Sequence, residues 1–151
     1  MNERSEQRTF CSHIGSTLDC VGYYSLQLGS DQVSEVLGAK RSYVGNHVAF
    51  AAVNVTFLGV HEPYQRQGLG EHLLMDVFSK VAAISKHAGF YALTLQSLDE
   101  QSTAFYESLN FEAYAGSEKQ HKMLYPLEDT LTLVDGRKLP AASPPAPTET
   151  A

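Results

Sequence analysis

The sequence predicts a mixed α/β domain with at least one parallel pair of strands. Strand-like and helix-like segments follow one another in the order β, β, β, helix, β, helix, β, β. Residues 49–60 have the composition of a buried strand, and residues 69–84 have the clearest helical periodicity of the chain. Because a further strand follows that helix, we expect the strands on its two sides to run parallel.

The first third of the chain is predicted to form a β-hairpin and a connection. Residues 8–14 and 20–28 are rich in Cys, Val, Tyr and Leu, and residues 15–19 between them carry turn-forming side chains. Residues 31–41 are polar and are expected to connect the hairpin to the next strand, with a short helical turn at 33–37.

The central third is predicted to contain a buried strand and a long amphipathic helix. The run at 49–60 is rich in Val, Phe and Ala, which is typical of a strand buried on both faces. It is broken at 61–64, because Pro63 disfavours helical geometry at the residue before it. Gly89 is expected to end the helix as a C′ glycine. The apolar stripe of this helix consists of Leu69, Leu73, Leu74, Val77, Phe78, Val81 and Ile84.

The last third is predicted to contain three strands and one shorter helix. Ser97 and Asp99 offer caps for that helix, and Asn110 can adopt the left-handed turn after it. The strands are expected at 90–95, 111–115 and 121–127, and the helix at 101–109.

We expect one domain at 8–127 and a tail at 128–151. The 151 residues fit one ordinary domain, and a hydrophobic content of 43% supplies a core. Beyond Asp135 and Gly136 the tail is rich in Pro, Ala, Ser and Thr, so it is expected to be disordered from about residue 136.

Charge and cysteine content restrict the classes of function. Eleven Lys and Arg against seventeen Asp and Glu give a net charge of −6, which disfavours non-specific binding to nucleic acid. Residues 1–8 lack the apolar stretch of a signal peptide, and the run at 48–60 is too short to span a bilayer. Cys11 and Cys20 are too few for a disulfide scaffold and are expected to be reduced residues of the core or hairpin. The sequence therefore predicts a soluble, cytoplasmic protein with no membrane partner.

A glycine-containing turn between the central strand and the long helix carries the strongest chemical signal. The first amides of a helix lack intrahelical partners and attract phosphate, and the glycines of QRQGLG at 65–70 allow close approach. Arg66 adds a positive charge. A turn that needs small residues only for packing would look the same, so this alternative stays open. The chain lacks a Walker loop, and Leu73 occupies the third glycine position of the dinucleotide fingerprint, which disfavours ATP and NAD.

Two segments resemble signatures of the GNAT family of N-acetyltransferases. Residues 65–70 fit its Gln/Arg-x-x-Gly-x-Gly/Ala motif, and residues 58–64 are similar to the strand that precedes it. Residues 99–111, which include AFYESLNF at 104–111, resemble the second signature, in which a helix with a Tyr precedes an Asn/Gly-Phe turn. The resemblance covers about 20–127. It implies a mixed, mostly antiparallel sheet with a central splayed parallel pair. The first expected strand matches the family's second, so we expect the family's N-terminal strand and helices to be shortened or absent: lost, trimmed or supplied by a partner chain.

The resemblance implies that acetyl-CoA binds where the two parallel strands separate, near Val60 and Leu95. Its pantetheine would bond to the backbone of Leu58–Val60 like an added strand. Its pyrophosphate would lie on the amides of 67–71, and an amide near Val60 would polarise the thioester carbonyl. No metal is implied. The cofactor-binding residues implied in this way are Leu58, Val60, Gln65, Arg66, Gln67, Gly68, Leu69, Gly70, Glu71 and Asp99.

Tyr106 matches the family's general acid, which protonates the departing thiolate of CoA. A phenol suits this role because its ordinary pKa lies above that of the thiol. An ordinary buried Tyr that anchors the short helix is the alternative. Asp99 either contacts pantetheine or only caps the helix. The general base stays unassigned among Asn54, Thr56, His61 and Glu62.

The sequence says least about the acceptor, which is the amine that would receive the acetyl group. Residues 21–26, 99–111 and 124–127 resemble the GNAT toxins that acetylate the amino acid on charged tRNA, but those proteins are generally basic. We therefore expect an N-acetyltransferase that transfers an acetyl group to a primary amine of a small molecule or a protein, with no nucleic-acid partner outside the toxin alternative. A non-catalytic acyl-CoA-binding module is a further alternative, and a homodimer is an expected assembly.

Overall fold

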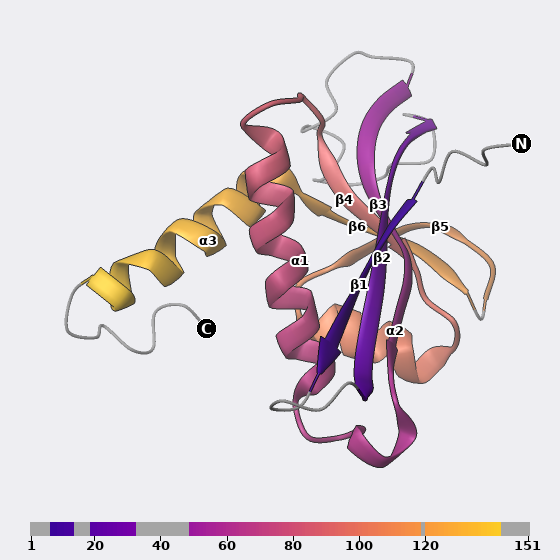
Figure 1. Cartoon of the computed structure of the whole chain (residues 1–151). Helices are drawn as coiled ribbons and strands as arrows, with labels where there is room; N and C mark the ends of the chain where they lie inside the picture. The colour runs from indigo at the N-terminus through magenta and orange to yellow at the C-terminus, as the bar shows by residue number, and fades with distance from the viewer. Residues whose placement is uncertain (1–6, 14–18, 33–48, 119, 143–151) are drawn as a thin grey trace, which may run out of the picture.

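The computed structural model describes residues 7–13, 19–32, 49–118 and 120–142, which form a six-stranded sheet with helices against it (Figure 1). A short 3-10 turn at Glu62–Tyr64 precedes the first α-helix. The strands are β1 (Gln7–His13), β2 (Cys20–Gln32), β3 (Ala49–Val60), β4 (Ala92–Gln96), β5 (Glu112–Gly116) and β6 (His121–Pro126). The α-helices are α1 (Leu69–Ser85), α2 (Glu100–Ser108) and α3 (Leu127–Ala142).

The sheet has the order β1-β2-β3-β4-β6-β5 and contains the predicted parallel pair at its centre, β3 with β4. The other neighbours are antiparallel. The parallel pairing ends at Val55 and Leu95. From there β3 continues to Val60, whereas Ser97, just after β4, donates its amide to the carbonyl of His121 on β6 (2.8 Å). The two strands therefore separate, and the predicted fold with a splayed central pair is confirmed.

A β-bulge in β3 lies where the strands separate. The register pairs Leu26 with Val55 but Ser25 with Phe57, so Thr56 is an extra residue of β3. The Thr56 hydroxyl donates to the carbonyl of Ser25 (3.4 Å). A bulge bends its strand and reverses which residues face each side of the sheet. This extra residue gives a local cause for the turn of β3 away from β4.

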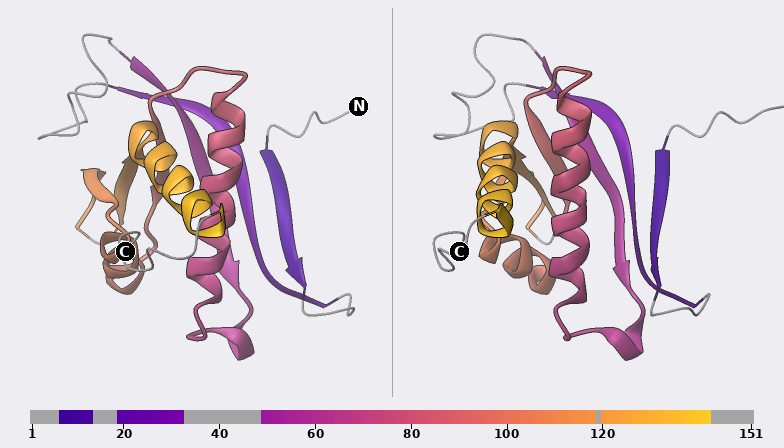
Figure 2. Two further views of the ribbon diagram at one scale, coloured as in Figure 1. Left: turned by 90° about the vertical axis from the view of Figure 1, so that its left-hand side faces the viewer. Right: turned by 60° about the vertical axis from the view of Figure 1, so that its left-hand side comes forward.

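The main core lies between one face of the sheet and the helices. Figure 2 shows α1, α2 and α3 on the same side of β2 and β3. The predicted stripe of α1 is largely confirmed, because it buries Leu73, Leu74, Val77, Phe78, Val81 and Ala82. Burial of each large side chain contributes roughly 1.5–3 kcal/mol. A smaller cluster around Phe50 and Tyr114 is separate from this core. Because Phe50 belongs to the smaller cluster and Val53 to the main core, the first half of β3 is buried on both faces, as predicted.

Helix α3 was not predicted from the sequence. The prediction was a tail after 127 that becomes disordered from about 136, but α3 extends from Leu127 to Ala142. Leu127, Leu133 and Val134 pack against the main core, and Thr130 is fully buried. These positions share one helical face, but Gly136 and the prolines concealed the pattern. The rest of the expected tail, 143–151, is outside the described residues.

The expectation of two reduced cysteines was wrong for this structure. Cys11 on β1 and Cys20 on β2 form a disulfide, with their Cα atoms 6.0 Å apart. The count of cysteines argued against a disulfide scaffold, but one bridge needs only two cysteines that lie close together. The hairpin brings Cys11 and Cys20 within reach, although the register pairs Cys11 with Tyr23 and Cys20 with His13.

Three boundaries differ from the prediction. Helix α1 ends at Ser85, and Gly89 has no positive φ, so Gly89 is not its C′ glycine. Strand β4 begins two residues later than expected, and β2 continues to Gln32 into the expected connection. The expected helical turn at 33–37 is outside the described residues. None of the helices in the described ranges is long and apolar enough to cross a membrane.

Candidate active site

The turn that leads into α1 has an uncapped helix N-terminus. Gly68 is the N-cap residue, it has φ 80°, and no side chain caps the helix there. Arg66 also has a positive φ, 61°, which is uncommon for a residue with a Cβ. Backbone that alternates in this way gathers N–H groups into a concave anion site. The first amides of α1 have no intrahelical acceptor, so they are available to an external anion.

Two glutamine side chains hold this turn in place. Gln65 donates its side-chain amide to the carbonyl of Val60 (3.0 Å), and Gln67 donates to the carbonyl of Pro63 (3.4 Å). The Arg66 side chain is exposed, as is Glu71 in the first turn of the helix. The glutamines of the signature therefore support the turn, while Arg66 is available to a ligand.

Space for a ligand opens beside the turn. A pocket of about 420 Å³ lies between this turn with the start of α1 and the facing ends of β1 and β2. Its lining residues are Ser12, His13, Val21, Tyr64, Gln67, Gly68, Leu69 and His72. The turn is therefore not filled by neighbouring side chains. A larger pocket, about 850 Å³, lies between β1 and the second half of α1. Its mostly apolar lining does not fit a diphosphate, so we place the candidate site at the turn.

The end of β3 offers backbone groups to the space between the splayed strands. His61 donates its amide to the carbonyl of Val21 on β2 (2.8 Å). Backbone groups alternate in direction along a strand, so those of Val60 and Leu58 point to the opposite edge. β4 no longer pairs with that edge after Val55. The backbone groups of Leu58 and Val60 therefore face the edge that β4 leaves, where the Val60 carbonyl accepts from the side chain of Gln65.

Three elements meet beside the space that opens between β3 and β4 after Val55, which we call the splay. A Cβ added to Gly70 would lie 3.5 Å from the Phe105 ring and 3.9 Å from a methyl group of Val60. The first turn of α1, the end of β3 and helix α2 are therefore in contact at this point. Phe105 was not among the residues that we selected from the sequence, because its apolar side chain gave no chemical signal.

Asp99 is a helix cap in this structure. Its carboxylate accepts from the amide of Ser102 (2.8 Å), and the Ser102 hydroxyl accepts from the amide of Asp99 (2.9 Å), which forms a capping box. The Ser102 amide holds the pKa of Asp99 below its ordinary value. The predicted helix cap is therefore present, and Asn110 after α2 has the predicted left-handed backbone, φ 70°.

Tyr106 lies on the inner face of α2 and is only 8% exposed. Its ring contacts those of Phe105 and Phe111 at centroid distances of 5.3 and 5.7 Å. Burial raises the pKa of its phenol above the ordinary value of 10.0. Among the described residues its hydroxyl has no hydrogen-bond partner. No fully buried side-chain oxygen there lacks a partner, so this hydroxyl is not fully buried. This Tyr therefore keeps its proton at neutral pH and has an uncommitted hydroxyl.

The structure identifies no general base. His61 and Glu62 are exposed at the end of β3, and Asn54 is half-buried on the strand. Thr56 is at the bulge, with its hydroxyl bonded to the backbone of β2. Within the described ranges, no three His, Cys, Asp or Glu side chains are close enough together to hold a metal ion.

Comparison with known proteins agrees with this geometry. A family model described as an acetyltransferase (GNAT) domain matches residues 21–113, from β2 to β5. No curated protein matched the chain in a sequence comparison.

The solved structures similar to this chain include structures of KacT and AtaT. A Tyr-to-Phe mutant of KacT aligns with TM-score 0.76 and 25% identity over 85% of this chain and 75% of that chain. AtaT complexed with acetyl-methionyl-tRNAfMet aligns with TM-score 0.75 and 20% identity over 85% of this chain and 76% of that chain. A Tyr-to-Phe mutant of the AtaT toxin, bound to the C-terminus of the antitoxin AtaR and to acetyl-CoA, gives TM-score 0.61 and 23% identity over 76% and 64% of the two chains.

Proposed function

The chain belongs to the GNAT acetyltransferase family, and we propose that it transfers an acetyl group from acetyl-CoA directly to a primary amine. One observation carries this proposal. The uncapped N-terminus of α1, with its left-handed residues Arg66 and Gly68, lies directly after the strand that separates from β4. A helix N-terminus that can bind a diphosphate thus lies next to a strand edge that can bind a chain containing amides. CoA has both a diphosphate and an amide-containing pantetheine chain.

The residues present fit CoA. Backbone amides from Gln67 to Glu71 would bind the pyrophosphate, with Arg66 as the nearby cation. The backbone of Leu58 and Val60 would bond to the amides of pantetheine. Asp99 would contribute only through the carboxylate oxygen that the Ser102 amide leaves free. When bound, acetyl-CoA supplies an acetyl group activated as a thioester.

The protein's own contribution to the chemistry lies in two groups. A backbone amide at the end of β3, near Val60, would stabilise negative charge on the carbonyl oxygen that is attacked. Tyr106 would hold a proton on its hydroxyl and donate it to the departing sulfur. Because burial raises its pKa, the phenol is protonated at neutral pH, as a general acid must be.

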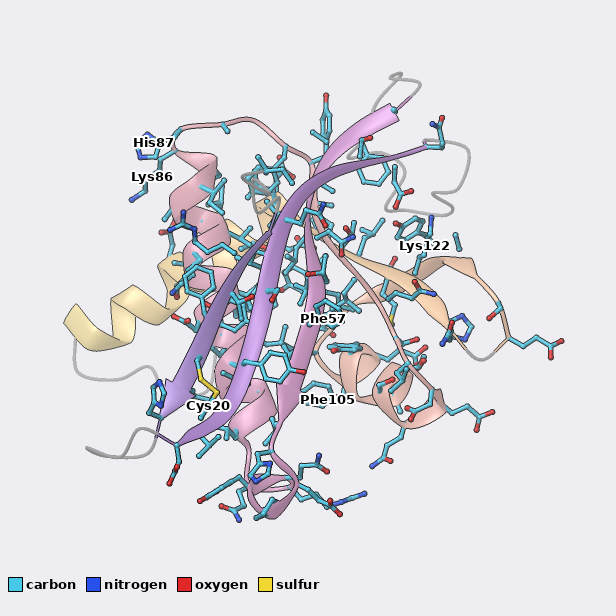
Figure 3. The ribbon with its side chains drawn as sticks, turned by 45° about the vertical axis from the view of Figure 1, so that its right-hand side comes forward. Cys20, Phe57, Lys86, His87, Phe105 and Lys122 are labelled. Atoms are coloured by element: carbon cyan, nitrogen blue, oxygen red, sulfur yellow. A yellow bond between two sulfur atoms is a disulfide. The ribbon has the colours of Figure 1, made fainter. Side chains whose placement is uncertain are left out.

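The cofactor part of the proposal is tested by thermal shift with acetyl-CoA. Saturation at about 100 Kd should stabilise the protein by about 2.7 kcal/mol, so the Tm should rise with ligand concentration. Arg66→Ala should weaken binding roughly 3- to 10-fold through loss of one charge-assisted contact. Lys86→Ala is the matched control, because Lys86 is an exposed cation at the opposite end of α1 (Figure 3). No shift with acetyl-CoA, or equal effects of the two substitutions, would contradict the proposal.

A second candidate acceptor is aminoacyl-tRNA, as in the toxin alternative. The observation that favours it is the similarity to AtaT, which was solved with acetyl-methionyl-tRNAfMet. The net charge of −6 opposes it, and Asp99, Glu100 and Glu107 make the exposed side of α2 acidic. An acetylation assay that compares free amines with charged tRNA separates the two candidates. A tRNA substrate should lose affinity steeply as salt rises, whereas a small amine should not.

A third candidate is a non-catalytic acyl-CoA-binding module. Tight binding of acetyl-CoA without acetyl transfer to any amine in a broad panel would favour it. The AtaT structure with an antitoxin suggests that a protein partner is worth testing as well. A homodimer and a cytoplasmic location stay part of this proposal, to be tested by sedimentation and by fractionation.

A further inference from the structure

Two aromatic side chains are exposed on the side of the sheet away from the helices, beside the splay. Tyr23 on β2 is 44% exposed and Phe57 on β3 is 56% exposed. Tyr24 and Leu26 of β2 belong to the main core under the helices, so Tyr23 and Ser25 point to the other face. Phe57 is paired with Ser25 and therefore shares that face. We define Tyr23 and Phe57 as the aromatic pair.

The sheet is shaped to hold the ring of Tyr23 in place. Gly59, the cross-strand partner of Tyr23, has no side chain, and a Cβ there would lie 3.0 to 3.3 Å from three atoms of the Tyr23 side chain. The Tyr23 ring therefore lies across the backbone of β3 next to Val60. Glycine in a strand is typical of such a close approach.

Phe57 owes its outward position to the β-bulge. Val55, before the extra residue Thr56, and Leu58, after it, both pack on the main core, although three positions separate them along the strand. The bulge thus turns Phe57 outward at the point where β3 leaves β4. Figure 3 shows Phe57 on β3 and Phe105 on α2 beside this point.

Core side chains occupy the helix side of the space between β3 and β4. Tyr106, Phe111 and Leu73 belong to the buried core there. The proposed acid would protonate the departing sulfur from that side, so an amine would reach the thioester from the other face of the sheet. On that face, the exposed large apolar side chains of β2 and β3 in the described ranges are those of Tyr23 and Phe57.

We infer that the aromatic pair is the acceptor subsite, and that the acceptor is a primary amine with a flat or apolar group near its nitrogen. This inference rests on the proposed acetyl transfer and assigns its substrate class. Ring stacking or edge contact contributes beyond simple burial, so each ring should favour such an amine roughly 2- to 12-fold. A free arylalkylamine and the amino group of an aminoacyl ester with an aromatic side chain share this chemistry.

The test compares amines that differ only in the flat group. The purified full chain with acetyl-CoA is given phenethylamine or ethylamine, and kcat/KM is measured for each by release of CoA. The expected result is a preference for phenethylamine that Phe57→Ala and Tyr23→Ala each reduce roughly 2- to 12-fold. Gly59→Ala should reduce it as well, because it displaces Tyr23. Leu28→Ala, which removes an exposed apolar side chain from β2 outside the pair, should leave the preference unchanged.

A second arm distinguishes the sources of the amine. Phenylalanyl-tRNA and glycyl-tRNA replace the free amines in the same assay. If Phe57→Ala reduces the preference for the aromatic substrate only among the aminoacyl esters, the acceptor is an aminoacyl ester. If it reduces the preference only among the free amines, the acceptor is a small molecule. Either result supports the subsite.

A binding measurement separates failure of this inference from failure of the proposed function. Phenethylamine is titrated into the protein with CoA and followed by the NMR signals of its ring protons. Acetyl transfer with equal efficiency for both amines overturns the subsite and leaves the proposed function standing. Binding that depends on Phe57 without any transfer supports the subsite and overturns the proposed function. Neither transfer nor binding overturns both.

Discussion

Tyr106 combines burial with an uncommitted hydroxyl, and both properties come from its neighbours. Phe105 and Phe111 enclose its ring, and no described side chain accepts its proton. A tyrosine with a buried ring usually finds a hydrogen-bond partner for its hydroxyl, so one without a described partner is an informative observation at a candidate site. Burial also keeps the phenol neutral far above physiological pH.

Tyr106→Phe should abolish most of the acetyl transfer and keep the cofactor. Loss of a general acid typically lowers kcat about 10²- to 10⁴-fold, while the ring still fills its place in the core. Steady-state kinetics and an acetyl-CoA titration measure the two effects. Tyr125→Phe, another tyrosine whose pKa burial raises, is the control and should retain activity. An unchanged kcat in Tyr106→Phe would exclude the acid role.

Helix α2 begins with a complete capping box, so its position depends on Asp99. The same helix carries Tyr106 and Phe105, which form one wall of the splay. Sequence reasoning found both the cap and the helix, because capping is a local property. It could not decide whether Asp99 also contacts a ligand, since that depends on how α2 faces β3.

Asp99→Ala should lower the Tm by about 2–4 °C, because the amide of Ser102 loses its acceptor. Asp99→Asn keeps an acceptor and should have a smaller effect on the Tm. Differential scanning calorimetry measures both variants. If Asp99→Asn weakens acetyl-CoA binding without lowering the Tm, Asp99 contacts the cofactor; if binding is unchanged, the cap is its whole role.

The turn before α1 illustrates how far sequence reasoning reaches at the scale of an element. The motif at 65–70 predicted an anion seat, and the structure adds that Arg66 and Gly68 are both left-handed. Gly68 has no neighbour that a Cβ would meet, so its φ alone requires glycine. The sequence could not assign the two glutamines, because their acceptors are backbone atoms brought close by the turn.

At the scale of the whole molecule, the disulfide links the edge strand β1 covalently to β2. Nine positions separate Cys11 and Cys20, and a loop of that size contributes about 2–3 kcal/mol in the loop-entropy model. Reduction should therefore lower the Tm by several degrees. Thermal denaturation with and without reductant measures this, and the double variant Cys11→Ser, Cys20→Ser should show no response to reductant. An identical Tm in both conditions would contradict the contribution.

The stability of the whole molecule should also fall at alkaline pH. Burial is the main cause that raises the pKa of Tyr24, Tyr106 and Tyr125, so their neutral forms are favoured in the folded state. Their contribution is fully present below the unfolded value of about 10 and is lost as pH rises through the folded values. Urea denaturation from pH 7 to 11 should show a decline above about pH 10. Tyr24→Phe, which removes the hydrogen bond to Asp76, should reduce the slope of that decline.

The sequence by itself determined what depends on neighbours along the chain. Residue periodicity placed α1, the capping residues placed α2, and the composition of 49–60 placed the central strand. Together with the two signatures, these elements predicted the family and the position of Tyr106. Each of these properties is local, because hydrogen bonds and side-chain spacing within one element decide it.

Only the tertiary structure decided what depends on contacts between distant segments. The bulge at Thr56 became visible in the register of β2 against β3, and the disulfide in the approach of Cys11 to Cys20. Helix α3 is held by the core although Gly136 weakens its own helical preference. The outward position of Phe57 follows from that bulge. The sequence pattern within 49–60 could not reveal this outward position. The alternation of side chains between the two faces reverses at the bulge, and the bulge is defined only by the pairing with a neighbouring strand.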